Sequence, residues 1–571
     1  MLRPRPVQLL FVSLLLLLRP TVCQALFTGD FHGRFSLLGK LKLQATFRTS
    51  DTPDNNPIPI VAGDLVTQRN LAFLEFRHNL GSVTPWLQLE YFLQARFFYD
   101  AAWVVGPDVL KNDDVRRYYL FDNRDQINDR SWAAELFTGY VDFTSGPLFL
   151  RVGRQILSWG EMSTFRILDN INPLDTSSLA VDLLERLVPL WMLRANLAFK
   201  NVGPFSSVSV EGYYINGAID NTNGEDMIDG SPIIPPVGRC TQDDLDDCSD
   251  PLDLCKLEQV ITQVEDDYDA DRYGARLGMM LGGVDLNVAY LRIYSDIPVP
   301  FIDMDSFRPF TIGWEHVGAI LADGFCDPIG TLLAVENQKL DVVLKIDKVD
   351  VYGGSFNYSW PLIDTVIRGE FALFKNVPKM TSGSVRDMIE GMGSKIYLPI
   401  DDLTLANILA RVPLGDLETM ALPFSSGQIA TFDVLKYGIG LDKWTKIPFL
   451  NREDFLFILE YVGSKTLGYK ENTILIPWQG PNGETLYEPE YSNTFILITN
   501  TNYLNGNLTT QLVTMFEVES QALSLIPSIR YQWRKLEWEF SYFQTFSSSY
   551  VGNLGMLESR NEFTANFAFY F

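Results

Sequence analysis

Residues 85–99 read PWLQLEYFLQARFFY, and every second residue from Leu87 to Tyr99 is apolar or aromatic. The residues between them include Gln88, Glu90, Gln94 and Arg96. A period of two residues places alternate side chains on opposite faces of a β-strand. About 9 to 11 tilted residues are enough for a strand to cross a bilayer. The stretch therefore predicts a strand with one face suited to lipid.

The same alternation recurs along the chain, for example at 272–281, 284–294 and 536–542. Short turns such as 144–147 and 282–283 join strands in pairs, and long connections separate the pairs. The connections cover roughly 50–68, 99–131, 156–190, 216–271, 295–348, 375–430 and 464–490. Loops of this length are unusual in one compact soluble domain. Alternating short turns and long loops is typical of an outer-membrane β-barrel, with its turns on the periplasmic side.

The C-terminus, NEFTANFAFYF at 561–571, has the same period and ends on Phe571. It resembles the closing strand of bacterial outer-membrane proteins, which the barrel assembly machinery recognises. Because a single-chain bacterial barrel has an even number of strands, the pattern predicts an all-β transmembrane antiparallel barrel of about 18 strands, with 16 as the alternative. A barrel this wide leaves an aqueous channel unless loops fill it.

The N-terminus carries Arg3 and Arg5, then the apolar run LLFVSLLLLL at 9–18, then small residues up to Ala25. This pattern predicts a secretory signal peptide over 1–25, so 26–571 forms a single barrel. A lipoprotein acylated at Cys23 is the alternative. The net charge of −25 argues against binding to nucleic acid, whose phosphates need a basic surface.

Apolar faces against lipid place the polar faces inside the barrel, because charges facing lipid are costly. The predicted inner wall then carries Glu75, Arg77, Glu90, Arg96, Arg151, Arg194, Glu211, Arg272, Arg276, Arg368, Glu370, Arg530, Glu537 and Glu539. Both signs are common, whereas an ion-selective pore often shows a ring of one sign. The mixture favours mutually paired charges that hold the wall, and a solute path lined by the arginines is the alternative.

The sequence argues against an enzyme. The histidines are His32, His78 and His316, and none has companions that suggest a catalytic centre. No cluster has the spacing of a zinc site, and no glycine-rich phosphate loop is present. We expect neither cofactor nor metal, with calcium as a weak alternative at the acidic loop 216–271, whose oxygen ligands suit that ion.

Four cysteines remain after residue 25, all within the loops 216–271 and 295–348: Cys240, Cys248, Cys255 and Cys326. In an oxidising compartment they predict two disulfides with three possible connectivities, and free thiols are the alternative. Residues 251–268, and parts of the 375–430 loop, have the apolar spacing of helices. These loops would lie over the mouth as a cap or inside it as a plug.

One more stretch, VGRQILSWGEMSTFRILDNINPLD at 152–175, leads from a strand into a long loop. It resembles a family of bacterial outer-membrane proteins described as domain of unknown function 1302. The matching residues are Gly153, Arg154, Gln155, Trp159, Gly160, Asn172, Pro173 and Asp175. The resemblance implies an outer-membrane barrel that works with periplasmic and inner-membrane partners to move hydrophobic compounds, and it supplies no catalytic residues.

We interpret this stretch as the hinge where a strand passes into a loop that folds across or into the pore. Gly153 would let the loop approach the wall, Arg154 and Gln155 would lie at the rim, and Trp159 would anchor the loop or lie at the interface. The function expected is an outer-membrane channel or transporter for small or hydrophobic molecules, alone or as a homo-oligomer in outer-membrane lipid. A surface receptor or adhesin with disulfide-pinned loops is the alternative.

Overall fold

The computed structural model describes residues 27–30, 34–51, 61–107, 132–173, 187–219, 261–265, 271–295, 299–302, 310–311, 319, 335–337, 340–345, 348–379, 381, 396–397, 430–479, 485–549, 551–558 and 560–571. These residues are mostly strand, with two helices of four residues, α2 (Ala102–Val105) and α14 (Gly552–Gly555). No helix in this part of the chain is long and apolar enough to cross a membrane. The predicted signal peptide lies outside the described residues.

Eighteen long strands form one closed antiparallel barrel, as the alternation predicted. Their bounds are β2 (Arg34–Arg48), β3 (Leu65–Thr84), β4 (Leu87–Asp100), β5 (Trp132–Ser145), β6 (Leu148–Gln155), β7 (Leu190–Val202), β8 (Phe205–Ile215), β10 (Arg272–Leu281), β11 (Val284–Tyr294), β15 (Lys348–Trp360), β16 (Thr365–Lys379), β18 (Ala430–Lys446), β19 (Asp454–Leu467), β22 (Tyr491–Tyr503), β23 (Leu508–Glu517), β24 (Ala522–Trp533), β25 (Leu536–Phe546) and β26 (Glu562–Tyr570). Each pairs with the next, and β26 pairs with β2 from Lys40↔Tyr570 to Arg48↔Glu562, which closes the ring. A short strand, β1 (Phe27–Asp30), pairs with the start of β2.

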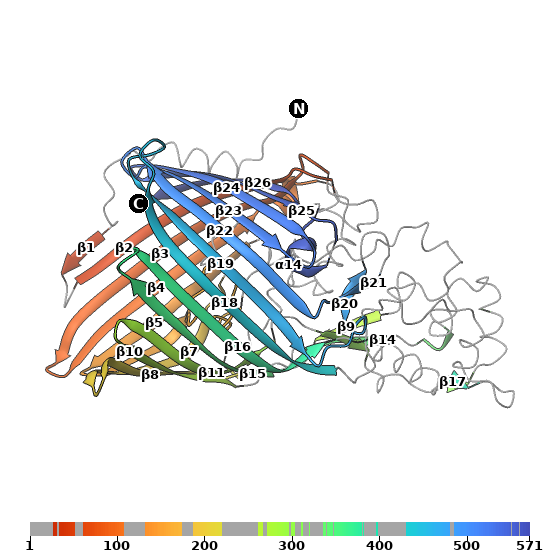
Figure 1. Ribbon diagram of the computed structural model, residues 1–571, viewed down its shortest axis with the longest axis horizontal. Coiled ribbons are helices and arrows are strands. Elements are labelled where there is room, and N and C mark those ends of the chain that lie inside the picture. Colours follow the sequence, from red (N-terminus) through yellow and green to blue (C-terminus); the bar gives the residue numbers. More distant parts are fainter. Residues whose placement is uncertain are drawn as a thin grey trace.

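The two ends of the barrel differ in the length of their connections. Tight turns such as 146–147 and 282–283 gather at one end, on the left of Figure 1, and the longer connections lie at the other end. We call these the short-turn end and the long-loop end. An exception is 518–521, a short connection between β23 and β24 at the long-loop end.

The two faces of the wall have the chemistry that the sequence predicted. On β4, Leu93 and Phe97 are exposed on the outer face, while Gln94 and Arg96 between them are hydrogen-bonded to neighbours on the inner face. Large apolar side chains are exposed in the same way on many other strands, including Phe199, Phe495 and Phe540. The barrel therefore presents an apolar outer belt, as a lipid-facing surface requires.

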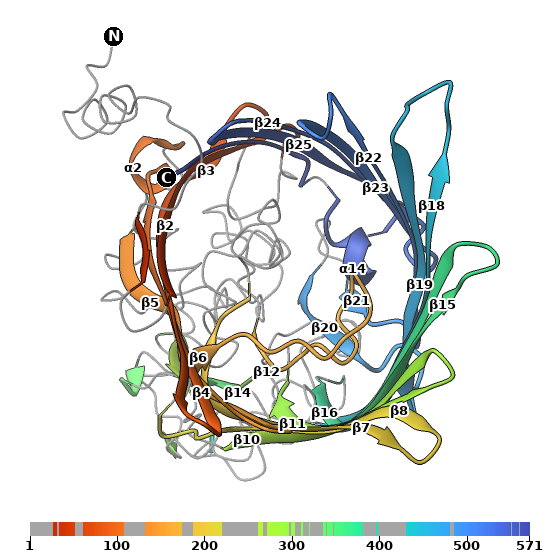
Figure 2. The same cartoon turned by 90° about the vertical axis from the view of Figure 1, so that its left-hand side faces the viewer.

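Two described stretches between strands lie inside the ring of strands when it is viewed along the barrel in Figure 2. One is residues 156–173, which follow β6 and which we call the inward segment. The other contains α14, whose Leu554 is packed in the same buried cluster as Phe543 and Met515 of the wall. The core of this protein is thus formed between the inner wall and the chain that it encloses.

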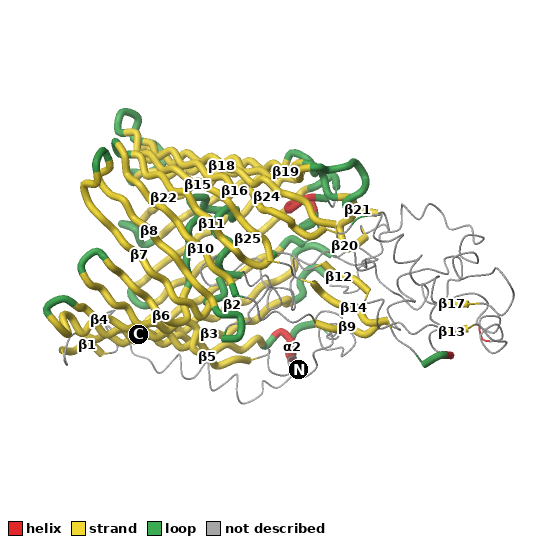
Figure 3. The backbone as a smooth tube through the Cα atoms, turned by 90° about the horizontal axis from the view of Figure 1, so that it is seen from below, coloured by secondary structure: helices red, strands yellow, loops and turns green. Residues whose placement is uncertain are grey.

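The long-loop end carries three small sheets, two of which join different long loops, and the largest has three strands. In this three-stranded sheet β14 (Leu340–Lys345) pairs with β9 (Ile261–Glu265) and with β12 (Val299–Ile302); Figure 3 shows it beyond the barrel strands. The other two pair β13 (Phe310–Thr311) with β17 (Ile396–Tyr397) and β20 (Leu475–Gln479) with β21 (Thr485–Tyr487).

The three-stranded sheet corrects one prediction, because 261–265 is strand although 251–268 has helical apolar spacing. Pairing with a partner more than 70 residues away in sequence overrides a local preference. The predicted helices in the 375–430 loop lie outside the described residues, apart from Ile396, which belongs to β17. The loop also begins later than predicted, because β16 continues to Lys379.

Candidate functional site

The inward segment begins where β6 ends, and Gln155 fixes that point. The side chain of Gln155 is buried and its amide donates to the carbonyls of Met192 (3.0 Å) and Gly153 (3.3 Å). Arg154 pairs with Glu135 at 3.4 Å and donates to the Pro189 carbonyl at 3.2 Å. Gln155, the last residue of β6, is thus enclosed against the neighbouring strand β7, where its amide satisfies backbone carbonyl groups.

Position 153 must lack a side chain, but for a different reason from the one expected. Its φ is +139°, and an added Cβ would lie 2.6 Å from the Cα of Tyr140 on β5. The close approach is therefore to the neighbouring strand. Space for the inward segment comes from Gly353 and Gly438 on the inner wall, where added Cβ atoms would overlap Leu168 and Ile167.

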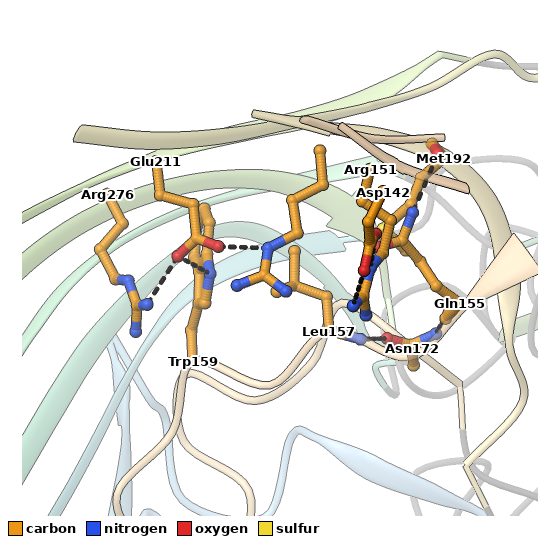
Figure 4. Close-up of polar contacts among 10 residues, drawn as sticks. Asp142, Arg151, Gln155, Leu157, Trp159, Asn172, Met192, Glu211 and Arg276 are labelled. Atoms are coloured by element: carbon orange, nitrogen blue, oxygen red, sulfur yellow. Dashed lines mark hydrogen bonds and ion pairs between the residues drawn. The ribbon is translucent and has the colours of Figure 1, made fainter. Parts of the chain in front are cut away.

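Asn172 ties the two ends of the inward segment together, as Figure 4 shows. Its Oδ1 accepts from the Leu157 N–H at 2.8 Å, and its Nδ2 donates to the carbonyls of Gln155 (3.2 Å) and Val188 (2.9 Å). The Pro173 carbonyl accepts from the Val188 N–H at 2.9 Å. The segment thus leaves and rejoins the wall at one place, while Asp175 lies outside the described residues.

Trp159 anchors the segment to the wall. It is 1% exposed, and its ring meets the Tyr213 ring edge to face with centroids 5.3 Å apart. Its Nε1 donates to Glu211 at 3.1 Å, and Glu211 also pairs with Arg194 and, at 2.6 Å, with Arg276 (Figure 4). Buried charges are stable only when they are paired and hydrogen-bonded, so Trp159 completes the partners of an enclosed carboxylate.

The backbone of the segment is held by a second carboxylate, Glu370 on β16. Its Oε2 accepts from the N–H groups of Glu161 (2.6 Å) and Met162 (3.2 Å), and its Oε1 from that of Leu168. Gly160 lies at this turn, where an added Cβ would lie 2.8 Å from Asp169. Three backbone donors on one buried carboxylate are charge-assisted bonds that hold a single loop conformation.

Arg368 on the same strand completes this attachment. It donates to the Glu161 carbonyl and to Ser163 Oγ (3.2 Å), and it pairs with Asp442 (2.6 Å) and Glu460 (3.0 Å). Glu460 in turn accepts from the Ser163 N–H at 2.8 Å. Side chains of β16 and β19 therefore hold one side of the segment, and side chains of β8 and β10 contact the other.

Two acidic side chains of the segment lie close to these attachments. Burial raises the pKa of Asp169 above its ordinary 3.8, although the Arg166 guanidinium, Ser158 and the Trp159 backbone favour its charged form. Burial also raises the pKa of Glu161, against the opposing effect of Asn357 and Arg368. Both carboxyl groups are therefore easier to protonate here than in water.

The other predicted inner-wall residues form pairs away from the segment. Arg77 meets Glu90 at 3.5 Å, Arg151 holds Asp142 through two bonds of 2.7 and 2.8 Å, and Arg96 pairs with Glu135. Glu75 accepts from Gln94 at 2.7 Å, Arg530 pairs with Glu539 at 2.8 Å, and buried Arg272 lies 5.0 Å from the Tyr294 ring. The geometry is that of paired charges along the wall.

Sequence reasoning missed Asp442 and Glu460. The alternation in the sequence predicts a strand over 431–441, which stops one residue before Asp442, whereas β18 continues to Lys446. Glu460 stands in the run FLFILEYV at 455–462, in which both faces are apolar. A lone carboxylate in such a run was the available signal, because a buried charge needs a reason to be there.

Several predicted features fall elsewhere. His78 is buried on the outer face near the short-turn end, 2.8 Å from the Tyr91 hydroxyl and edge to face with Phe35, so it is a packing residue. His32, His316, most of the acidic loop with its predicted calcium site, and the cysteines at 240, 248, 255 and 326 lie outside the described residues. The described residues hold no group of acidic, histidine or cysteine side chains that could bind a metal.

Several solved structures are similar in fold at low identity. The Acinetobacter baumannii OccAB3 structure is 11% identical, with a TM-score of 0.42 over 94% of this chain and 99% of that one. Pseudomonas aeruginosa OpdK with vanillate is 6% identical, with a TM-score of 0.42 over 94% and 98%. Salmonella typhi OmpF with daunomycin is 8% identical, with a TM-score of 0.38 over 95% and 100%. Because these values are low, the barrel rests on its own strand pairing.

No curated protein matches the sequence. A family model does match, and it spans residues 8–541, which include the inward segment and nearly the whole barrel. The chain therefore belongs to the family described as protein of unknown function DUF1302.

Proposed function

We propose that this protein is an outer-membrane channel for small or hydrophobic molecules, in which the inward segment forms the constriction. The observation that carries the proposal is the seating of residues 156–173 inside a closed barrel, held by Glu211 on one side and Glu370 on the other. A loop that served only as an outer binding surface would need no such attachments at the inner wall.

The outer belt supports a membrane location. Apolar side chains cover the outer face of the strands, which would be costly against water over so large an area. By the usual arrangement of such barrels, the short-turn end faces the periplasm and the long-loop end faces outward. The secretory signal expected at 1–25 agrees with that orientation.

The first test is conductance across a planar lipid bilayer, with wild-type protein refolded in detergent. We expect discrete current steps, and larger or noisier steps for Glu370→Gln. The amide keeps the size of the carboxylate but weakens three charge-assisted bonds, each worth about 1.5–3 kcal/mol. The matched control is Glu90→Gln. This substitution also removes one inner-wall charge, but Glu90 pairs with Arg77, away from the segment.

A barrel that carries no current and no solute flux, in the wild type and in Glu370→Gln alike, would contradict the channel. That result would favour a receptor or adhesin anchored by the barrel. Equal effects of Glu370→Gln and Glu90→Gln would instead show that the segment is not the constriction.

A further inference from the structure

Aromatic rings and guanidinium groups form a row of contacts along the inner wall from β3 to β7. The Arg77 guanidinium lies 5.5 Å from the Phe92 ring, and Phe92 stacks on Tyr140 with centroids 5.3 Å apart. Arg151 lies 3.7 Å from the Tyr140 ring. Each contact joins neighbouring strands, so the row follows the wall around the barrel.

At the end of this row two arginines face each other. Arg151 on β6 is directly opposite Arg194 on β7, and the Phe149 ring lies 5.6 Å from each guanidinium. Like charges directly opposite each other on paired strands destabilise a sheet. The opposition is therefore a cost that calls for a compensating negative charge.

The carboxylates of the wall do not lie between these two arginines. Asp142 pairs with Arg151 from β5, and Glu211 pairs with Arg194 from β8. Glu211 also pairs with Arg276, so Arg194 shares its one carboxylate partner with a second arginine. Within the residues that the structure describes, no carboxylate bridges Arg151 and Arg194.

Both guanidinium groups keep free donor capacity. The bonds between described residues use Nε and Nη2 of Arg151 and Nε of Arg194. The side chains are 20% and 22% exposed, so they can be reached from inside the barrel. A planar carboxylate matches the guanidinium fork, and an aromatic ring such as Phe149 favours an apolar body beside it.

We propose that Arg151, Arg194 and Phe149 bind the carboxylate of a small solute with an apolar or aromatic body, beside the constriction. This inference rests on the proposed channel and narrows its solutes to organic carboxylates. The site is joined to the inward segment, because Glu211 accepts both from Arg194 and from Trp159.

Isothermal titration of the full chain in detergent with benzoate tests the site without requiring transport. Asp142→Asn/Arg151→Gln removes one charge of each sign, so the net charge of the wall does not change. We expect benzoate affinity to fall about tenfold or more, since one charge-assisted contact is lost. Arg194→Gln gives a second variant, in which Glu211 keeps Arg276.

The matched control is Arg530→Gln/Glu539→Gln, a pair on β24 and β25 that is also 2.8 Å apart, and it should leave affinity unchanged. Benzyl alcohol should bind at least tenfold more weakly than benzoate, as should inorganic phosphate. Phosphate binding as tight as benzoate would overturn the assignment to carboxylates. Wild type that does not bind benzoate, or variants that all bind like wild type, would overturn the site.

The two proposals fail in different ways. Benzoate binding without any bilayer conductance contradicts the channel and leaves the site in place. Conductance without benzoate binding contradicts the site and leaves the channel in place.

Discussion

At the scale of single residues, Gly153 is the clearest point at which the wall depends on one amino acid. We predict that Gly153→Ala lowers the thermal stability of the folded barrel more than Gly203→Ala does. Both positions have positive φ. At Gly203 the φ of +57° is left-handed helical and costs an alanine about 1–2 kcal/mol, whereas the φ of +139° at Gly153 is sparsely populated and costs about 1–3 kcal/mol. Only at Gly153 would the Cβ also meet a neighbouring strand, which adds about 1–3 kcal/mol of overpacking.

Heat-modifiable gel migration measures this difference, because the folded barrel migrates differently from the unfolded chain. Gly203, in a tight turn with no atom within 4 Å of an added Cβ, is the control for an alanine at positive φ without a steric contact. Equal losses at the two positions would show that β5 gives way to the added methyl group.

The sequence predicted individual inner-wall residues where polar and apolar side chains alternate, as for Arg368 and Glu370. It failed for Glu460, because a strand that is apolar on both faces gives no period-two signal. It also misassigned Gly153, because a missing side chain does not tell which neighbour needs the space.

At the scale of elements, the seating of the inward segment should depend on pH through Asp169. Burial raises the pKa of Asp169, so the seated segment binds a proton more readily than the released one does. The seated state of the segment is then favoured at low pH. It becomes less stable as the pH rises above the ordinary Asp pKa of 3.8 and passes the raised pKa of Asp169. We expect channel openings in a planar bilayer to become more frequent between pH 4 and 8.

Asp169→Asn should reduce this pH dependence and keep the rate of opening near its low-pH level, because an amide stays neutral. Glu161, whose pKa is also raised, accounts for the dependence that is left. A pH profile identical to that of wild type would show that Asp169 does not control seating.

The path of this segment could be predicted only in part. Its sequence indicated a loop that folds across or into the pore, but the attachments come from wall residues about 50 to 300 positions away along the chain. The strand at 261–265 was missed for a related reason, since its partner at 340–344 determines its conformation.

At the scale of the whole molecule, the strand number followed from turn and loop lengths, because each short turn defines a hairpin even when strand boundaries are loose. The closing seam was predicted from the C-terminal strand, and the structure adds how it ends. The Phe571 ring occupies the space above Gly39, and the two backbones exchange bonds of 2.8 and 2.9 Å. The last residue thus belongs to the seam as well as to the predicted assembly signal.

Phe571→Ala separates these two roles. The backbone bonds across the seam do not involve the ring, so refolding in detergent should yield nearly as much heat-modifiable barrel as wild type. In cells we expect the amount of folded protein in the outer membrane to fall several-fold, because the assembly machinery would lose its C-terminal aromatic residue. The matched control is Phe569→Ala, whose ring stacks on Phe571 at 5.8 Å but is not terminal. If refolding in detergent falls as much as assembly in cells, the ring is needed to close the barrel itself, and the predicted recognition of Phe571 is not needed to explain the loss.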